Sequence, residues 1–429
     1  MSKALVYVEF EKLGFAGHHT FTLNSYATCV NNELDDITPI LICHKCGNNI
    51  KNSFSGYHQI LDVLPIPVNP NSTVIDLINL IESMEKVVAD LAERFDQLII
   101  YTHMPSPYSL LSVLATAFKV VDPKITFLTR LCMTDQEWEW YQLPLSWLVS
   151  AADTMPNCKF TTESVNLSDY YACHTEKSLK LQFNPLPIRS RLLSKSIKKF
   201  ASNYSNPFVL SFLGEAREEK GYHHLNQFID VWSEYCPYPY TFIIHSFANV
   251  NNRTSIINNA KQAVSKISQQ NNHIKYFDCP IPGHIYDSHL MRSDLIVLPY
   301  DIGKYRVRGS GVSYEAYWNF CCQAVTRGSD MEATFKGVGN LIDFQPGHLN
   351  DQDVRKMISI ILKNREACNE KTTDNLHESS FSSILHSFYE ETNNDSAPET
   401  DCVFNSLYSL LESKRGCGVL ELVYDLRNI

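Results

Sequence analysis

Apolar runs rich in β-branched and aromatic residues alternate with longer helical patterns along most of this 429-residue chain. Parallel strands need a long connection between them, and a crossover helix is the usual one, so this alternation is typical of parallel α/β sheets. In the first half we expect strands at 4–10, 37–43, 57–66, 97–101, 124–130, 157–164 and 179–188. In the second half we expect strands at 207–214, 240–246, 274–277, 294–300 and 322–327. The predicted fold class is therefore α/β, with two Rossmann-like, doubly wound lobes.

Helical patterns lie between these runs at 20–32, 73–94, 107–119, 221–235, 253–270 and 312–320. The two series are separated by a short segment with five basic and no acidic side chains, although the whole chain has a net charge of −10. We expect a domain linker there, because few contacts cross such exposed stretches. The predicted organisation is an N-terminal domain over 1–186, a basic linker over 187–200, a C-terminal domain over 201–370 and an acidic, loop-rich tail over 371–429 with a terminal helix and strand.

The charge balance also bears on partners and compartment. A duplex nucleic-acid binder usually carries a broad basic face, which an acidic chain does not supply, so nucleic acid is not an expected partner. No apolar run reaches the ~18 residues of a membrane span, and charges interrupt the first apolar run, so we expect a cytoplasmic protein. The basic segment 189–199 suits contact with the inner face of an anionic membrane, although a solvated linker helix is the more frequent explanation of such a segment.

Doubly wound sheets bind ligands outside the carboxyl ends of their strands, so the residues after each strand are the first candidates. After the first strand, Gly17 and His18 belong to a glycine-containing turn that opens a helix, where exposed N–H groups can meet a ligand. After the fourth strand comes His103, whose ring nitrogens suit a polar substrate hydroxyl. The alternatives are a purely structural turn and a histidine satisfied by a loop carbonyl.

In the second half, Arg217 and Lys220 follow the strand at 207–214 and are three residues apart around a turn. A forked guanidinium and an ammonium at that spacing can converge on one diphosphate. The same two cations could instead form an ion-pair cluster with Glu215, Glu218 and Glu219, and spacing alone leaves both interpretations open.

A second candidate follows the strand at 294–300, where a cationic loop turns through Gly-Ser-Gly into a helix. Amides of such a turn and the helix dipole favour a phosphate, and Arg308 adds a positive charge. Glu315, one turn into the helix, is placed to accept hydrogen bonds from both hydroxyls of a ribose. The alternative is a capped helix with an exposed glutamate.

The segments SFLGEAREEKGYHHL and SDLIVLPYDIGKYRVRGSGVSYEA resemble the nucleotide-sugar half of family 4 glycosyltransferases, the configuration-retaining enzymes of GT-B architecture. The likeness spans about residues 4–365 and implies two lobes that face each other across a cleft. It implies that Arg217 and Lys220 hold the donor diphosphate and that Glu315 binds the ribose. The amide-bearing turn beneath the phosphates is then formed by Ser310, Gly311 and Val312.

In the first lobe, the resemblance places His103 near the transferred sugar and makes Gly17 and His18 part of a loop that closes over the diphosphate. It also implies that no metal or other cofactor is needed, since Arg217 and Lys220 take over the electrophilic role of a divalent ion. Such an enzyme binds a nucleotide-sugar donor and passes the sugar to a saccharide, lipid-linked or protein acceptor.

Two departures from the family pattern affect this prediction. Val307 stands where the family has a glutamate that contacts the donor sugar, so Arg308 or Tyr305 would replace it. A Gly-x-Pro turn is replaced by Phe320-Cys321-Cys322. The expected function is thus retaining sugar transfer from a nucleoside-diphosphate sugar, with a nucleotide-sugar epimerase or a catalytically silent sugar-nucleotide-binding protein as alternatives.

Overall fold

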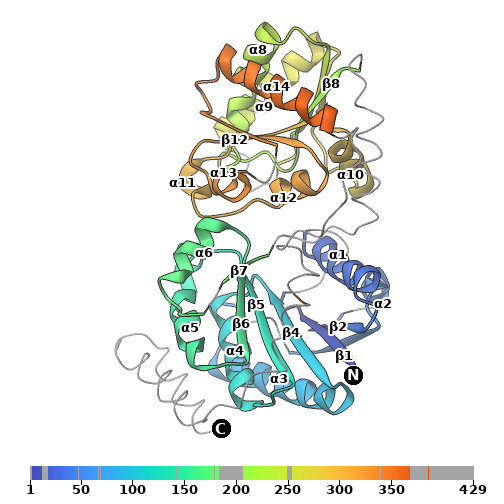
Figure 1. Cartoon of the computed structure of the whole chain (residues 1–429), viewed down its shortest axis with the longest axis vertical. Coiled ribbons are helices and arrows are strands. Elements are labelled where there is room, and N and C mark those ends of the chain that lie inside the picture. The colour runs from blue at the N-terminus through green and yellow to red at the C-terminus, as the bar shows by residue number, and fades with distance from the viewer. Residues whose placement is uncertain are drawn as a thin grey trace. The chain divides into compact units, whose positions relative to one another are not determined.

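Figure 1 shows the computed structural model of the chain, which divides into two compact units. One unit consists of Met1–Pro187 with Leu376–Ile429, and the other of Ile188–Asn375. The structure describes residues 2–11, 18–46, 48–65, 67, 69–141, 143–177, 179–182, 206–248, 254–337, 340–367 and 385. No helix within these ranges is both long enough and apolar enough to cross a membrane.

The first unit is built on a seven-stranded parallel sheet with the order β3-β2-β1-β4-β5-β6-β7. Its strands are β1 (Lys3–Val8), β2 (Ile37–His44), β3 (Gln59–Leu64), β4 (Gln97–His103), β5 (Ile125–Leu131), β6 (Cys158–Thr162) and β7 (Lys180–Leu181). The helices that connect them are α1 (His18–Glu33), α2 (Asn48–Lys51), α3 (Val74–Arg94), α4 (Pro107–Lys119), α5 (Leu145–Ala151) and α6 (Val165–Ala172). Short 3₁₀ turns lie at Asn52–Phe54, Asp135–Tyr141 and Ala152–Thr154.

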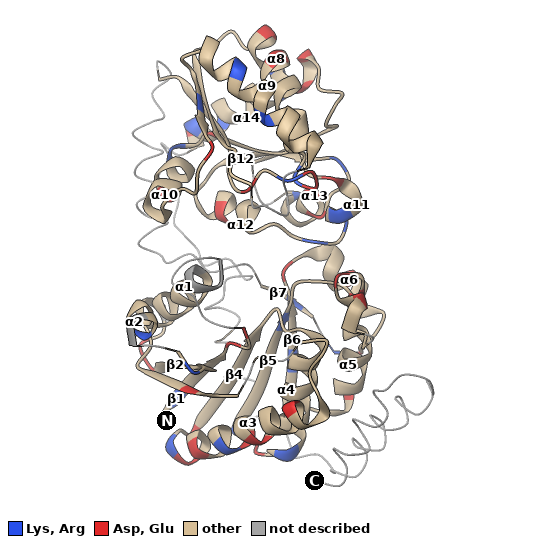
Figure 2. Cartoon of the chain, turned by 180° about the vertical axis from the view of Figure 1, so that it is seen from behind, with Lys and Arg blue, Asp and Glu red and all other residues tan. Residues whose placement is uncertain are grey.

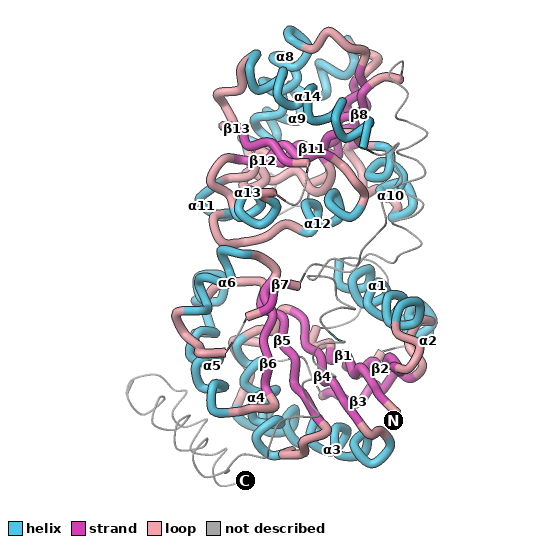
Figure 3. Tube along the Cα trace, in the orientation of Figure 1, coloured by secondary structure: helices cyan, strands magenta, loops and turns pink. Residues whose placement is uncertain are grey.

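Both faces of this sheet are covered, which explains why its strands are continuous apolar runs. Alternate strand residues such as Val6 and Ile100 pack with α3, α4 and α5 on one face. Their neighbours, such as Tyr7 and Tyr101, pack with α1 on the other. Figure 3 shows α3 and α1 on opposite sides of the strands. Leu385 is fully buried in the cluster on the α1 face.

The second unit contains a six-stranded parallel sheet with the order β10-β9-β8-β11-β12-β13. Its strands are β8 (Phe208–Phe212), β9 (Tyr240–His245), β10 (Ile274–Phe277), β11 (Leu295–Leu298), β12 (Cys322–Thr326) and β13 (Leu341–Phe344). Its helices are α8 (Leu225–Tyr235), α9 (Ser255–Gln270), α10 (Gly283–Arg292), α11 (Ile302–Tyr305), α12 (Gly311–Trp318), α13 (Asp330–Phe335) and α14 (Asp351–Ala367), with a 3₁₀ turn at Tyr222–His224. One face packs on α8, α9 and α14, and the other on α10 to α13 (Figure 1).

A buried ion pair fixes α14 to the sheet of the second unit. Arg365 donates from Nε to Asp294 Oδ1 at 3.0 Å and from a terminal nitrogen to Asp294 Oδ2 at 2.7 Å. Its other contacts are the carbonyl oxygens of Asn206 and Pro207, and its guanidinium lies over the ring of Phe208. The end of α14 is thereby tied to the starts of β8 and β11.

The predicted fold class is confirmed, since each unit is a doubly wound parallel sheet. The expected strands occur within a few residues of their predicted bounds, except the one expected at 179–188. There β7 comprises only Lys180 and Leu181, Gln182 is outside the strand, and 183–188 lie outside the described residues. Sequence reasoning missed β13 and the helices α5, α6, α10, α13 and α14. The expected linker at 187–200 lies outside the described residues, as does the expected tail apart from Leu385.

Candidate functional site

In the second sheet the strand order reverses between β8 and β11. From this point, β8, β9 and β10 follow one another towards one edge of the sheet, and β11, β12 and β13 follow one another towards the other edge. Crossover helices therefore leave this point to opposite faces, and the loops after β8 and β11 line the space at its carboxyl edge. The two segments singled out in the sequence, 213–221 and 299–310, are these two loops.

The two loops are in direct contact. The amide of Asp301 donates to the carbonyl oxygen of Glu219 at 2.8 Å. Gly221 has a left-handed φ of +64°, and a Cβ atom there would lie 1.7 Å from the carbonyl oxygen of Pro299. Only glycine permits this approach, because any side chain would overlap the neighbouring backbone. The loops that follow β8 and β11 therefore lie against each other, although about eighty residues separate them in the sequence.

Lys220 lies where the two loops meet. A Cβ atom on Gly214, whose φ is +112°, would lie 3.2 Å from Lys220 Nζ and 4.0 Å from Val312 Cγ2, so the ammonium borders the start of α12. No carboxylate of the described residues is within ion-pair distance of Lys220, and Nζ lies 5.8 Å from the centre of the Tyr300 ring. Burial, aided by the charges of Arg217 and Arg308, lowers the pKa of Lys220 to about 8.

Arg217 behaves differently from Lys220. It forms ion pairs with Glu215 at 2.6 Å and with Glu219 at 3.2 Å, which is the alternative that the sequence left open for this residue. Glu218 does not join the cluster with Arg217 but accepts a hydrogen bond from Thr254. The structure therefore offers one ammonium without a carboxylate partner in the described chain and one guanidinium that is already paired.

Arg308 contributes a third positive charge. Its guanidinium carbon lies 5.5 Å from the centre of the Tyr305 ring, and its charge acts on Lys220. Figure 2 marks basic residues on α11 and in the loop beside it. Like charges are brought together only at a free-energy cost, so the closeness of Lys220 and Arg308 favours the binding of an anion.

The first turn of α12 adds backbone donors to this group. Ser310 is the N-cap residue, but its side chain makes no hydrogen bond to the helix. Its hydroxyl is 3.5 Å from that of Tyr300 instead. Within the described chain, the amides of Gly311 and Val312 have no protein acceptor. Such N–H groups and the helix dipole attract anions.

Glu315 lies one turn further along α12 and is partly buried. It accepts a hydrogen bond from the hydroxyl of Tyr286 on α10. Burial raises the pKa of Glu315 to about 7, while Tyr286 and the charge of Lys220 act in the opposite direction. The charge of Lys220 thus acts on the carboxyl group of Glu315, so the two side chains belong to one candidate site. Sequence reasoning missed Tyr286, because no helix was predicted around it.

Tyr286 also adjoins a pair of histidines. His245, at the end of β9, and His289, on α10, are joined by a hydrogen bond of 3.0 Å between Nε2 and Nδ1. Burial, and then the neighbouring His289, lowers the pKa of His245 to about 4. At neutral pH this strand-end histidine is therefore an uncharged part of the wall beside Tyr286.

The turn after α12 contains the Phe320-Cys321-Cys322 departure. Phe320 has a left-handed φ of +56°. The amide of Phe320 donates to Tyr317 O at 3.1 Å, and that of Cys321 donates to Ala316 O at 2.9 Å. These two bonds form a Schellman motif, which normally places glycine where Phe320 stands. The helix thus ends in a regular way despite the bulky residue.

In the first unit, the strand order reverses between β1 and β4, and His103 is the last residue of β4. The next residue, Met104, has a left-handed φ of +47°, so the chain turns sharply there. Gly17 and the side chain of His18 lie outside the described residues, although His18 begins α1. The structure adds Arg130, which contacts His103 and which sequence reasoning counted only as the end of a strand.

No group of three or more metal-binding side chains occurs among the described residues. The cations that the described side chains bring to the site are Arg217, Lys220 and Arg308. Their arrangement suits an anionic group of the size of a diphosphate beside a hydroxyl-bearing group at Glu315.

Comparison with known proteins gave no matching family model and no matching curated protein sequence. Solved structures do match over nearly the whole chain. A glycosyltransferase from Rickettsia africae is 13% identical with a TM-score of 0.58, and the match covers 92% of this chain and all of that one. The HepE protein of Anabaena in complex with UDP is 14% identical with a TM-score of 0.53, covering 96% and 100% of the two chains.

A third match is the UDP-GlcNAc 2-epimerase of Neisseria meningitidis bound to UDP-GlcNAc. It is 12% identical with a TM-score of 0.52, and the match covers 96% of this chain and 99% of that one. At such identities the likeness concerns the fold. With two doubly wound parallel sheets in one chain, the protein has the GT-B fold of these glycosyltransferases.

Proposed function

We propose that this protein transfers a sugar from a nucleoside-diphosphate sugar to an acceptor, with retention of the anomeric configuration. The observation that carries the proposal is the gathering of Lys220, Arg308 and the free amides of α12 at the point where the second sheet reverses its strand order. In this assignment the second unit binds the donor. The first unit binds a saccharide, lipid-linked or protein acceptor, and His103 orients the transferred sugar.

The proposed chemistry follows from the charges. The diphosphate gains negative charge as its bond to the sugar breaks, so cations and N–H groups already in place stabilise the transition state more than the bound donor. Lys220 is the best placed of the cations because it has no carboxylate partner within the described residues. Arg217 contributes by exchanging one of its contacts with Glu215 or Glu219 for a phosphate oxygen.

Glu315 supplies the second recognition element. Its ionised carboxylate accepts hydrogen bonds from ribose hydroxyls while the phosphates lie at the start of α12. Tyr286 already occupies one oxygen of this carboxylate and so holds it in a single orientation. Arg308 and Tyr305, which lie beside each other, take the place of the family's donor-sugar glutamate at Val307.

A panel of labelled UDP-, GDP- and ADP-sugars tests the proposal. Release of the nucleotide together with a glycosylated or hydrolysed product supports transfer, and the anomeric configuration of the product tests retention. Glu315→Ala is expected to weaken nucleotide binding, and Lys220→Ala to lower turnover by about 10²–10³-fold. Lys356→Ala is the matched control, because Lys356 is an exposed lysine on α14, which packs on the face of the sheet opposite α11 and α12.

A nucleotide-sugar epimerase is the second candidate, and the likeness in fold to UDP-GlcNAc 2-epimerases supports it. It would convert the donor into an isomer in the same panel without any acceptor. Binding of a nucleotide sugar with neither product would identify a catalytically silent binding protein. No binding to any member of the panel would contradict all three functions.

A further inference from the structure

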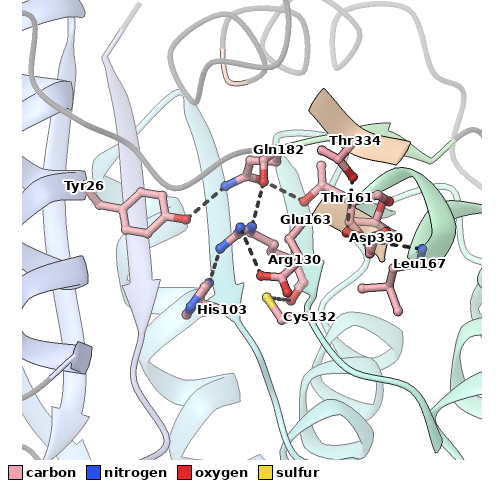
Figure 4. A network of polar contacts seen from close by, with 12 residues as sticks. Tyr26, His103, Arg130, Cys132, Thr161, Glu163, Leu167, Gln182, Asp330 and Thr334 are labelled. Carbon is pink, nitrogen blue, oxygen red and sulfur yellow. Dashed lines mark hydrogen bonds and ion pairs between the residues drawn. The ribbon is translucent and has the colours of Figure 1, made fainter. Parts of the chain in front are cut away.

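A buried arginine lies beside the candidate sugar-orienting histidine of the first unit. His103 and Arg130 end neighbouring parallel strands and face each other in register. A terminal nitrogen of Arg130 lies 3.2 Å from Nδ1 of His103. Arg130 has no exposed surface, and Figure 4 shows its guanidinium at the centre of a polar network that includes His103.

The position of Arg130 is fixed from several sides. Its Nε donates to the carbonyl oxygen of Gln182 at 2.9 Å, and a terminal nitrogen faces Glu163 Oε2 at 3.5 Å (Figure 4). The side chain of Gln182 is held in turn, since its Nε2 donates to Tyr101 and Tyr26 and its Oε1 accepts from Thr161. The guanidinium therefore has little freedom to turn away from the imidazole.

This contact determines the chemical state of the imidazole. Arginine remains protonated in proteins and has only donors, so the ring nitrogen that faces it must be the acceptor. A protonated imidazole would place an N–H donor and a positive charge against the guanidinium. The contact therefore requires a neutral ring with its lone pair on Nδ1 and its proton on Nε2.

We infer that Arg130 is a positioning residue that holds His103 as the neutral Nε2–H tautomer and thereby makes it a hydrogen-bond donor toward the substrate. The inference rests on the proposed function only for what His103 contacts. In that role His103 donates its Nε2 proton to an oxygen of the transferred sugar and does not remove a proton through that nitrogen.

The tautomer can be observed directly in the full-length protein. With ¹⁵N-labelled histidine, NMR couplings between the ring protons and the two nitrogens identify the protonated nitrogen, and His103→Gln assigns the signal. At pH 7 we expect the neutral Nε2–H form. A charged ring or an Nδ1–H tautomer in the wild-type protein would overturn the inference.

Two variants separate positioning from a merely structural role. Arg130→Met is expected to give a mixture of the two neutral tautomers. Glu163→Gln removes the ion pair of Arg130 but leaves its contact with His103, so the tautomer is expected to stay unchanged. If Arg130→Met does not fold, the wild-type spectrum and the Glu163→Gln control still decide the question.

Activity provides a separate readout. We expect the hydrogen bond from His103 to strengthen in the transition state, so its loss in His103→Phe is expected to lower kcat by about 10²–10³-fold. Arg130→Met is expected to lose less, because a fraction of the rings keeps the correct tautomer. The Nε2–H tautomer in a protein that transfers no sugar would refute the proposed function and leave the positioning by Arg130 intact. An equal kcat in Arg130→Met and the wild type, despite an altered tautomer, would overturn the donor role.

Discussion

Replacement of Lys220 by methionine is expected to stabilise the second unit while it impairs the reaction. The pKa of Lys220 falls from its ordinary value of 10.5 to about 8 in the folded protein, chiefly through burial and then through Arg217 and Arg308. A pKa that is lower in the folded than in the unfolded chain means that the charged form opposes folding. The fall corresponds to about 3 kcal/mol of free energy of unfolding, which a neutral side chain of similar length would recover.

The sign of the pH dependence follows from the same values. The cost of the charged ammonium is fully present below pH 8, diminishes as the pH rises through the folded-state pKa, and is gone near the unfolded-state value of 10.5. The stability gain of Lys220→Met over the wild type is therefore expected to be largest at pH 7 and small at about pH 10. Lys304→Met, on the exposed surface of α11, is expected to show no such difference.

Hydrogen exchange of peptides from β8 and β11 under increasing urea reports the stability of the second unit by itself. Turnover of the donor, measured on the same samples, is expected to fall by about 10²–10³-fold in Lys220→Met. If the free energy of unfolding at pH 7 is lower in Lys220→Met than in the wild type, burial of the charged ammonium of Lys220 does not destabilise the folded protein, and this reasoning is refuted. Unchanged turnover would refute its role at the diphosphate.

Three further outcomes are expected. Asp294→Ala removes the carboxylate that pairs with the buried Arg365 and is expected to lower the free energy of unfolding, measured by urea denaturation, by about 3–5 kcal/mol. Loss of the exposed ion pair between Arg355 and Asp351 is expected to lower it by at most ~0.5 kcal/mol. Phe320→Gly is expected to be more stable than Phe320→Ala by about 1 kcal/mol, because both remove the ring and only glycine is unstrained at that φ. Affinity for UDP is to be measured by calorimetry in the wild type and in Glu315→Gln. The advantage of the wild type is expected to grow as the pH rises through about 7, because only the wild type gains the ionised carboxylate of Glu315.

The fold and the location of the candidate site could be predicted from the sequence because both depend on chain order. Apolar strand runs that alternate with helices specify a parallel sheet, and a parallel sheet brings the carboxyl ends of its strands to one edge. The loops of Lys220 and Ser310 follow two such strands, so they meet once the strands become neighbours. The strand β13 was missed because its sequence, Leu-Ile-Asp-Phe, includes a charged residue and only Phe344 is buried, so it does not stand out as an apolar run.

The partners of individual side chains could not be predicted in this way. Arg217 had carboxylates on both sides in the sequence, and the backbone path of the loop decided which of them it pairs with. Tyr286 reaches Glu315 from a helix in which only Leu290 is buried, so that helix shows hardly any apolar pattern. The sequence did contain a signal for Arg130. A charged residue near the end of a largely apolar strand is rarely buried without a partner, so its position alone predicts a polar contact.

The contact between Gly221 and Pro299 limits how this protein can change in evolution. A methyl group at position 221 would overlap the backbone of the loop that follows β11, so the position next to Lys220 is closed to every other amino acid. The path of this loop is then fixed, and under the proposed function new preferences for base or sugar must arise by exchange of the side chains that surround it. Relatives that have diverged in donor choice are expected to keep the spacing from Gly214 to Gly221 while they differ at positions such as Tyr305 and Arg308.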